Sequence, residues 1–269
     1  MVMKQINFLH AAPRSGNTVF SALLNQNPAI NVSANSLVTD IMKAMVVGKD
    51  STMFQNFPDE KSFDNVLKLV YPNYYKDWSA DIIFDRSLVG YEKNYNLITK
   101  YVNPHFKCVV LIRDLFDVFA SYLKWADESP NCFLNENKIP VDKQIEHLMH
   151  PDGLIHQSLI GTINLYNNHR SNTIFIYYKD FVENPKKEID RLYRFFNLKD
   201  FQHNFENIPQ FEVNGIQYKD EIYGDNMHTI STNLLTFNED DTFKKYRSMI
   251  SNNLYKKYHG INKWMMSIK

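Results

Sequence analysis

The chain has 269 residues, and its 30 Lys and Arg balance 30 Asp and Glu, so the formal net charge is zero. This balance disfavours a nucleic-acid binder that depends on bulk electrostatic attraction, but it is compatible with one concentrated anion site. No apolar stretch is long enough to span a bilayer, and Cys108 and Cys132 make neither a disulfide framework nor a zinc site. We therefore expect a cytoplasmic protein that folds as a single domain over residues 1–269 and holds no metal.

Four short apolar runs have strand character, at residues 6–11, 82–84, 108–112 and 173–178. Segments with helical periodicity separate and follow them: residues 19–26, 37–47, 91–101, 115–125, 143–168 (interrupted near 151–153), 185–196 and 239–258. This alternation predicts an α/β fold with a central parallel β-sheet flanked by helices. Residues 202–238 lack clear periodicity, and a loop of that length is often a binding segment.

Polar residues follow each predicted strand at the point where it ends. Arg14 follows the first strand, Asp85 and Arg86 the second, Arg113 the third, and Tyr178 closes the fourth. The carboxyl ends of parallel strands share one edge of a sheet, where ligands bind. We therefore expect three arginines and a tyrosine to converge on one crevice, which indicates an anionic ligand with several charges.

The first of these loops concentrates anion-binding groups. Arg14 supplies a full charge, Ser15 and Thr18 supply hydroxyl groups, and Gly16 lets the backbone approach a ligand closely. With Asn17, these residues lead into a helix whose first N–H groups have no partner within the helix. An ordinary turn with an exposed arginine is the alternative reading. The loop is not a Walker A motif, because no Lys precedes Thr18.

A second anion site is predicted after the third strand. Arg113 ends that strand, and Ser121 lies two turns into the next helix, on the face that also carries Asp114 and Asp117. Asp114 is the expected N-cap of this helix. An N-capped helix beside a solvated arginine would explain the same residues without a ligand.

These segments resemble the sulfotransferase superfamily, whose members use 3′-phosphoadenosine 5′-phosphosulfate (PAPS). Residues 12–18, Ala-Pro-Arg-Ser-Gly-Asn-Thr, resemble its 5′-phosphosulfate loop, with Asn17 as a departure. Residues 109–122 resemble its 3′-phosphate motif, and residues 85–87 resemble the Asp-Lys-Ser/Thr element of bacterial members. Residues 177–198 resemble the strand end and helix that follow, with Lys179 where Glu is usual.

The resemblance covers residues 4–198, the expected nucleotide-binding core, and leaves 199–269 as C-terminal loop and helices. It implies a fold related to the nucleotide kinases, PAPS as donor and 3′-phosphoadenosine 5′-phosphate (PAP) as product, without a metal requirement.

The resemblance also implies roles for individual residues. Arg14 and the amides of Ser15, Gly16, Asn17 and Thr18 would hold the 5′-phosphosulfate. Arg113 and Ser121 would hold the 3′-phosphate, and Tyr178 would lie near the adenine. Arg86 would offer its charge to the transferring group, and a loop at residues 224–230, with His228, would fold over the nucleotide.

The general base is left open. Asp85 is a candidate at a strand end, although it could instead fix Arg86 or a turn. His10 reads more readily as a core histidine, and His228 is a further candidate with a structural alternative of similar weight.

Two other functions stay open beside sulfuryl transfer. One is an ATP-dependent phosphotransferase in which Asp85 holds Mg²⁺. The other is a nucleotide-binding protein without activity. The acceptor is not readable and could be a carbohydrate, lipid, peptide or phenol.

Overall fold

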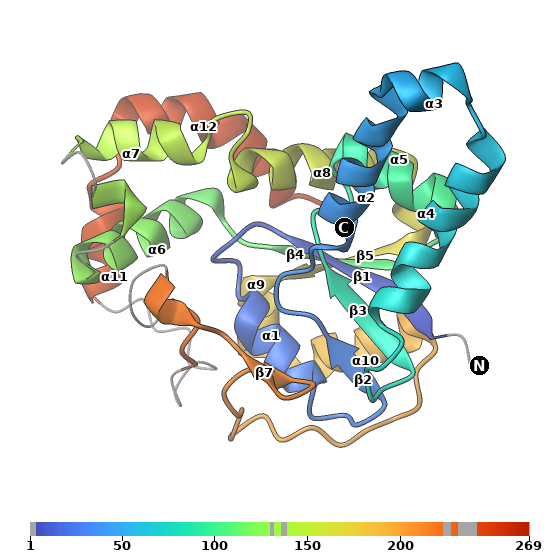
Figure 1. The fold of residues 1–269 in the computed structure, drawn as a ribbon. Coiled ribbons are helices and arrows are strands. Elements are labelled where there is room, and N and C mark those ends of the chain that lie inside the picture. Colours follow the sequence, from blue (N-terminus) through green and yellow to red (C-terminus); the bar gives the residue numbers. More distant parts are fainter. Residues whose placement is uncertain (1–3, 130–131, 136–138, 223–226, 231–240, 269) are drawn as a thin grey trace.

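The computed structural model describes residues 4–129, 132–135, 139–222, 227–230 and 241–268 (Figure 1). Its centre is a five-stranded sheet in the order β2-β3-β1-β4-β5, with every neighbouring pair parallel. The strands are β1 (Gln5–Ala11), β2 (Ile30–Val32), β3 (Ile82–Arg86), β4 (Cys108–Ile112) and β5 (Thr173–Tyr177). The predicted α/β fold with a central parallel sheet is confirmed.

Helices cover both faces of this sheet. The α-helices of the described residues are α1 (Asn17–Leu24), α2 (Val38–Val47), α3 (Thr52–Asn56), α4 (Glu60–Tyr74), α5 (Glu92–Tyr101), α6 (Leu115–Glu128), α7 (Val141–Leu148), α8 (Leu154–Asn168), α9 (Tyr178–Glu183), α10 (Pro185–Phe196), α11 (Asp241–Ser248) and α12 (Asn252–Met265). In Figure 1, α1, α9 and α10 lie below the sheet, and α2, α5 and α8 lie above it. Within the described part of the chain, no helix is both long and apolar enough to cross a membrane.

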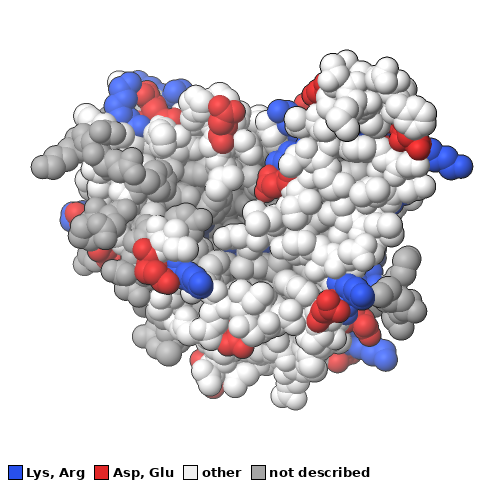
Figure 2. Space-filling model, in the orientation of Figure 1, with Lys and Arg blue, Asp and Glu red and all other residues white. Residues whose placement is uncertain are grey.

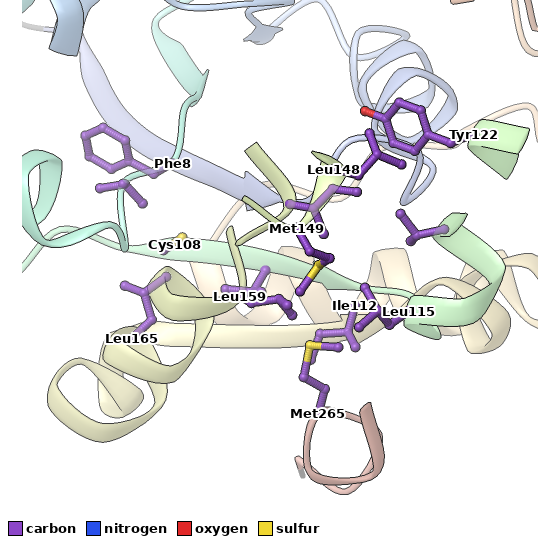
Figure 3. Close-up of a cluster of buried hydrophobic side chains, with 14 of the residues drawn as sticks. Phe8, Cys108, Ile112, Leu115, Tyr122, Leu148, Met149, Leu159, Leu165 and Met265 are labelled. Atoms are coloured by element: carbon purple, nitrogen blue, oxygen red, sulfur yellow. The ribbon is translucent and has the colours of Figure 1, made fainter. Parts of the chain in front are cut away.

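The central strands bury side chains on both faces, as a parallel sheet covered by helices requires. In β4, Cys108, Val110 and Ile112 belong to one apolar cluster, and Val109 and Leu111 belong to the other. Figure 3 shows part of the first cluster, where side chains of β1, β4, α6, α8 and α12 meet. Burying one large apolar side chain contributes about 1.5–3 kcal/mol, so these clusters fix the sheet firmly.

Several boundaries test the sequence pattern directly. The interruption predicted near residues 151–153 is confirmed, because α7 ends at Leu148 and α8 starts at Leu154. The single helix predicted over 239–258 is wrong within the described residues: α11 and α12 are separate, and the Ser251 hydroxyl caps the start of α12. Residues 239–240 lie outside the described residues.

Several elements have no counterpart in the prediction, among them β2, α4 and a C-terminal hairpin. Strand β2 has only three residues, and α4 buries only Leu67 and Tyr71, so neither gives a strong apolar pattern. A hairpin of β6 (Glu212–Val213) and β7 (Ile216–Gln217) occupies the segment without periodicity. Asn214 and Gly215 form its turn with φ of 54° and 73°, the conformation that Asn-Gly favours in two-residue hairpins.

Candidate active site

One cleft of about 720 Å³ opens at the carboxyl ends of the central strands. Its lining includes Arg14 after β1, Arg86 at the end of β3, Arg113 after β4 and Tyr178 after β5. The predicted convergence of these side chains is therefore confirmed. The volume is in the range of small-molecule sites. Figure 2 shows that this face of the molecule is hollowed near its middle, in the orientation of Figure 1.

The loop between β1 and α1 forms one wall of the cleft. Gly16 is the N-cap of α1 with φ of 86°, and the Asn17 side-chain amide closes the loop by donating to the Ala12 carbonyl at 3.1 Å. Among the described residues, the first hydrogen bond within α1 runs from the Phe20 N–H to the Gly16 carbonyl. The N–H groups that precede Phe20 in α1 have no partner within the helix, so they can bind an anion.

The residues of this loop differ in whether they line the cleft. Asn17 and Thr18 line it, whereas the side chain of Ser15 is buried and does not. Gly16 packs so closely on Tyr178 that a Cβ atom would lie 2.4 Å from the ring. The backbone at Gly16 therefore comes within contact of the residue expected beside the nucleotide base.

Arg14 and Ser121 from the two predicted anion motifs are in direct contact. Arg14 Nε donates to the Ser121 hydroxyl at 3.0 Å, and Arg113 Nη1 donates to the Arg14 carbonyl at 2.7 Å. The Arg113 guanidinium lies 4.5 Å from the centroid of the Tyr178 ring. The two motifs therefore build one cationic cluster around the start of α1.

The positive charges of Arg14 and Arg113 favour the binding of an anion between them. Burial lowers the pKa of Arg14, and the charge of Arg113 lowers it further, whereas Tyr122 and Tyr178 oppose the shift. Repulsion between Arg14 and Arg113 is relieved when an anion binds between them. Arg113 Nε is buried, with no hydrogen-bond partner among the described residues, so it can serve such an anion.

Asp114 is the N-cap of α6, as predicted. The Asp114 carboxylate accepts hydrogen bonds from the N–H groups of Phe116 and Asp117. Arg247 of α11 donates to the Asp117 carboxylate and lies 3.5 Å from Asp114. Both acids on this face of α6 are thus neutralised.

Arg86, at the end of β3, also lines the cleft. Its Nη1 donates to the Tyr218 hydroxyl at 2.7 Å, and its Nη2 donates to Asn35 Oδ1 at 2.6 Å. Both partners are neutral, so the positive charge of the guanidinium stays available to a ligand.

The structure corrects the expectation for Asp85. This side chain is 0% exposed and does not line the cleft, and its Oδ2 accepts hydrogen bonds from the Ser36 and Tyr75 hydroxyls. Burial raises the pKa of Asp85. Asp85 therefore lies behind the cleft wall, where it cannot touch reactants directly. Among the described residues, no group of acidic, His or Cys side chains is arranged to hold a metal.

The two histidine candidates have different surroundings. His10 is fully buried, its Nε2 lies 2.9 Å from the Ser158 carbonyl, and burial lowers its pKa to about 4. It is therefore a core histidine rather than a base. His228 lines the cleft, and its Nδ1 lies 2.6 Å from Asp220 Oδ1. The part of the predicted loop at residues 224–226 lies outside the described residues.

Comparison with known proteins gives the family. A family model described as a sulfotransferase domain matches residues 6–263. The chain belongs to the sulfotransferase family. None of the curated proteins matches this sulfotransferase.

Solved structures share the fold of this sulfotransferase at low sequence identity. The sulfotransferase domain from the curacin biosynthetic pathway is 13% identical with a TM-score of 0.56, over 98% of both chains. Mouse sulfotransferase SULT7A1, complexed with PAP, is 11% identical with a TM-score of 0.59, over 98% of this chain and 86% of the mouse chain. Retinol dehydratase, in complex with androsterone and PAP, is 15% identical with a TM-score of 0.52, over 98% of this chain and 81% of its own.

The C-terminal segment of this sulfotransferase, which the sequence predicts as a binding segment, adds individual site residues that the sequence did not single out. Tyr218 and Asp220 follow the β6–β7 hairpin, and the Met227 carbonyl accepts a hydrogen bond from Arg14 Nη1 at 2.7 Å. The Asn214-Gly215 dipeptide was the signal available, because it predicts a hairpin that returns the chain toward the site. The candidate site therefore includes residues that lie beyond the predicted nucleotide-binding core at residues 4–198.

Proposed function

We propose that this sulfotransferase takes the sulfuryl group from PAPS and transfers it to a hydroxyl or amine of an acceptor. The observation that carries the proposal is the joined cluster of Arg14, Arg113 and Ser121 beside the free N–H groups of α1. A nucleotide with anionic groups at both the 5′ and 3′ positions suits such a cluster. Arg14 and the N–H groups of α1 can bind one group, and Arg113 and Ser121 can bind the other.

The residues of the cleft fit this donor. Arg113 carries a buried Nε without a hydrogen-bond partner among the described residues, which suits an oxygen of a 3′-phosphate. The start of α1 and Arg14 suit a 5′-phosphosulfate. The closely packed Tyr178 ring, 4.5 Å from the Arg113 guanidinium, gives an aromatic surface for the nucleotide.

When PAPS is bound, it supplies a sulfur that forms a bond to the acceptor oxygen or nitrogen while the bond to the phosphate oxygen breaks. The electron pair of the broken bond stays on the phosphate oxygen. Arg14, Arg86 and the N-terminus of α1 stabilise that growing negative charge from fixed positions. Removing one donor of this kind typically costs on the order of 100-fold in rate.

An ATP-dependent phosphotransferase fits the site less well. In that function Asp85 would hold Mg²⁺, but Asp85 is buried behind the cleft wall with hydrogen bonds to Ser36 and Tyr75. The loop before Thr18 also lacks the lysine that cradles a terminal phosphate.

A thermal-shift titration separates these functions. PAP at about a hundred times its Kd should stabilise the protein by roughly 2.7 kcal/mol, a shift of several degrees, with or without magnesium. ADP should give a smaller shift, because it lacks the 3′-phosphate. A larger shift with ATP and magnesium, or no shift with PAP, would overturn the proposal. PAP binding without consumption of PAPS in any condition would indicate a nucleotide-binding protein without activity.

A further inference from the structure

His228 lines the cleft, and the carboxylate of Asp220 lies directly beside its imidazole ring. His228 Nδ1 lies 2.6 Å from Asp220 Oδ1, and the His228 backbone N–H donates to Asp220 Oδ2 at 2.7 Å. The two side chains are 13% and 18% exposed, so the pair is mostly shielded from water. Asp220 therefore fixes both the ring and the backbone of His228.

The pair lies between the two cations assigned to the transferring group. Next to His228, the Met227 carbonyl accepts a hydrogen bond from Arg14 at 2.7 Å. The His228 ring stacks on Tyr218 with centroids 3.7 Å apart and an interplanar angle of 1°, and the Tyr218 hydroxyl accepts from Arg86. The imidazole is thus connected to Arg14 on one side and to Arg86 on the other.

The short segment that carries His228 is held at both ends. Arg14 binds the Met227 carbonyl at its start. At its end, the Gln210 side chain donates to the Ile230 carbonyl at 2.7 Å and accepts from the Ile230 N–H at 2.9 Å. A ring that is held in this way has a fixed direction, which proton transfer requires.

The hydrogen bond to Asp220 determines what the ring can do. A carboxylate only accepts hydrogen bonds, so His228 Nδ1 carries the proton and Nε2 keeps its lone pair. No hydrogen bond to Nε2 is recorded among the described residues. Burial lowers the pKa of His228, Arg86 and Arg14 lower it further, and Asp220 opposes them. The ring is therefore neutral at pH 7 and able to accept a proton.

We propose that His228 is the general base of this sulfotransferase and that Asp220 is its positioning residue. The proposal rests on the proposed function. As the acceptor oxygen or nitrogen bonds to sulfur, its proton passes to His228 Nε2, and the electron pair of the breaking bond passes to the phosphate oxygen of PAP. The protonated ring then releases its proton to water.

Four other side chains that could act as a base lack one of these properties. Asp85 does not reach the cleft, and His10 is buried beside Ser158. Asp40 is 57% exposed and pairs with Lys43 at the rim. His147 lines the cleft but is exposed on α7. His228 alone among these combines a place in the cleft, a carboxylate partner and contacts that lead to both arginines.

The test compares H228Q and D220N with a matched control. His150 forms the other described His–Asp pair, 3.6 Å from Asp152; His150 is exposed and does not itself line the cleft, although Asp152 does. We expect H150Q to behave as the wild type. PAP affinity, measured by calorimetry, should change less than threefold in H228Q, because a base contacts the acceptor rather than the nucleotide. Absence of PAP binding by the wild type itself would instead refute the proposed function.

Single-turnover conversion of PAPS to PAP, with water as the acceptor, measures the chemical step without a known acceptor. The wild-type rate should fall on acidification, at a pH below the ordinary histidine pKa of about 6.5, as His228 becomes protonated, whereas H228Q should be about 100-fold slower with a flat profile. D220N should move the fall to lower pH, because Asp220 raises the pKa of His228. A tenfold loss of PAP affinity in H228Q with an unchanged rate would overturn the proposal and make His228 a nucleotide ligand.

Nuclear magnetic resonance of the imidazole tests the same proposal without turnover. With PAP bound at pH 7, the His228 signal, assigned by its loss in H228Q, should report a neutral ring protonated at Nδ1. A proton on Nε2, or a fully protonated ring, would overturn the proposal even if the wild type does not hydrolyse PAPS.

Discussion

Arg113 connects three parts of the candidate site through one side chain. It donates to the Arg14 carbonyl at 2.7 Å, lies 4.5 Å from the Tyr178 ring centroid, and keeps a buried Nε for a ligand. A planar guanidinium can do all three at once, whereas an ammonium group cannot. The identity of this residue, beyond its charge, therefore matters for the nucleotide.

Arg113→Lys should weaken PAP binding at least tenfold, which is about 1.4 kcal/mol. Isothermal titration calorimetry measures this loss. Arg194→Lys is the control, because Arg194 is exposed on α10, does not line the cleft, and its Nε donates to the carbonyl of Asp190 in the same helix. Equal PAP affinity of wild type and Arg113→Lys would contradict the role of the guanidinium.

Position 16 requires glycine for two reasons, its backbone conformation and its close neighbour Tyr178. Its φ of 86° favours glycine, and a Cβ atom would lie 2.4 Å from the Tyr178 ring. Gly215 in the hairpin has φ of 73° but no atom within 4 Å of such a Cβ. Gly215→Ala should therefore cost only the backbone penalty of about 1–2 kcal/mol.

Gly16→Ala should cost more than Gly215→Ala in the free energy of unfolding, measured by urea denaturation, and should also lower PAP affinity. The difference in free energy of unfolding between the two variants reports the contact with Tyr178, because both variants place alanine in the left-handed backbone region. Similar costs for the two variants would show that the loop can move away from Tyr178.

Within β3, the buried carboxyl of Asp85 and its hydrogen bonds to Ser36 and Tyr75 make the stability of the protein depend on pH. Burial raises its pKa in the folded state above the value of about 3.9 expected for the unfolded chain. The stabilisation from the protonated carboxyl is thus present at low pH and is lost as the pH rises through the folded-state pKa. Asp85→Asn removes this titration.

We expect the free energy of unfolding of the wild type, relative to Asp85→Asn, to fall as the pH rises from 4 toward neutral. Urea denaturation of both proteins across this range gives the difference. A difference that stays constant or grows with pH would mean that the hydrogen bonds from Ser36 and Tyr75 outweigh burial at Asp85.

The crossing of α8 over β1 depends on a glycine in the helix. A Cβ at Gly161 would lie 2.5 Å from His10 Cε1 and 2.8 Å from the Tyr91 nitrogen. In α12, by contrast, a Cβ at Gly260 would meet nothing within 4 Å. Helix propensity favours alanine by about 1 kcal/mol at both positions, so only the packing differs.

Gly161→Ala should therefore destabilise the protein by about 1–3 kcal/mol, whereas Gly260→Ala should stabilise it by up to about 1 kcal/mol. Thermal unfolding of the two variants measures the contrast. A Gly161→Ala variant as stable as the wild type would contradict the close approach of α8 to the sheet.

The elements that the sequence predicts well are those with a strong apolar pattern. Strand β4 alternates between two cores, and α6 has both an N-cap and a broad buried face, so each is readable without a structure. Strand β2 is too short to show a pattern, and α4 buries too little. The burial of Asp85 is equally hidden, because it depends on Tyr75 and Ser36 from other elements.

At the scale of the whole molecule, the site is assembled from segments far apart in the chain. Arg14 contacts Met227 and Arg86 contacts Tyr218, although 213 and 132 residues separate them. The anion cluster is predictable because its residues follow strands of the sheet. The family resemblance predicts that the loop at residues 224–230 folds over the nucleotide, but the individual C-terminal contacts are not predictable. The segment after the hairpin carries no periodic pattern, so nothing in the sequence pairs Met227 with Arg14 or Tyr218 with Arg86.

The central claim is that this cleft holds a nucleotide with a 3′-phosphate. The most direct measurement is calorimetric titration of the wild type and Ser121→Ala with PAP and with ADP, which lacks that phosphate. We predict that the wild type binds PAP at least tenfold more tightly than ADP and that Ser121→Ala reduces this ratio. Equal affinity for the two nucleotides in the wild type, or tighter binding of ADP, would contradict the claim.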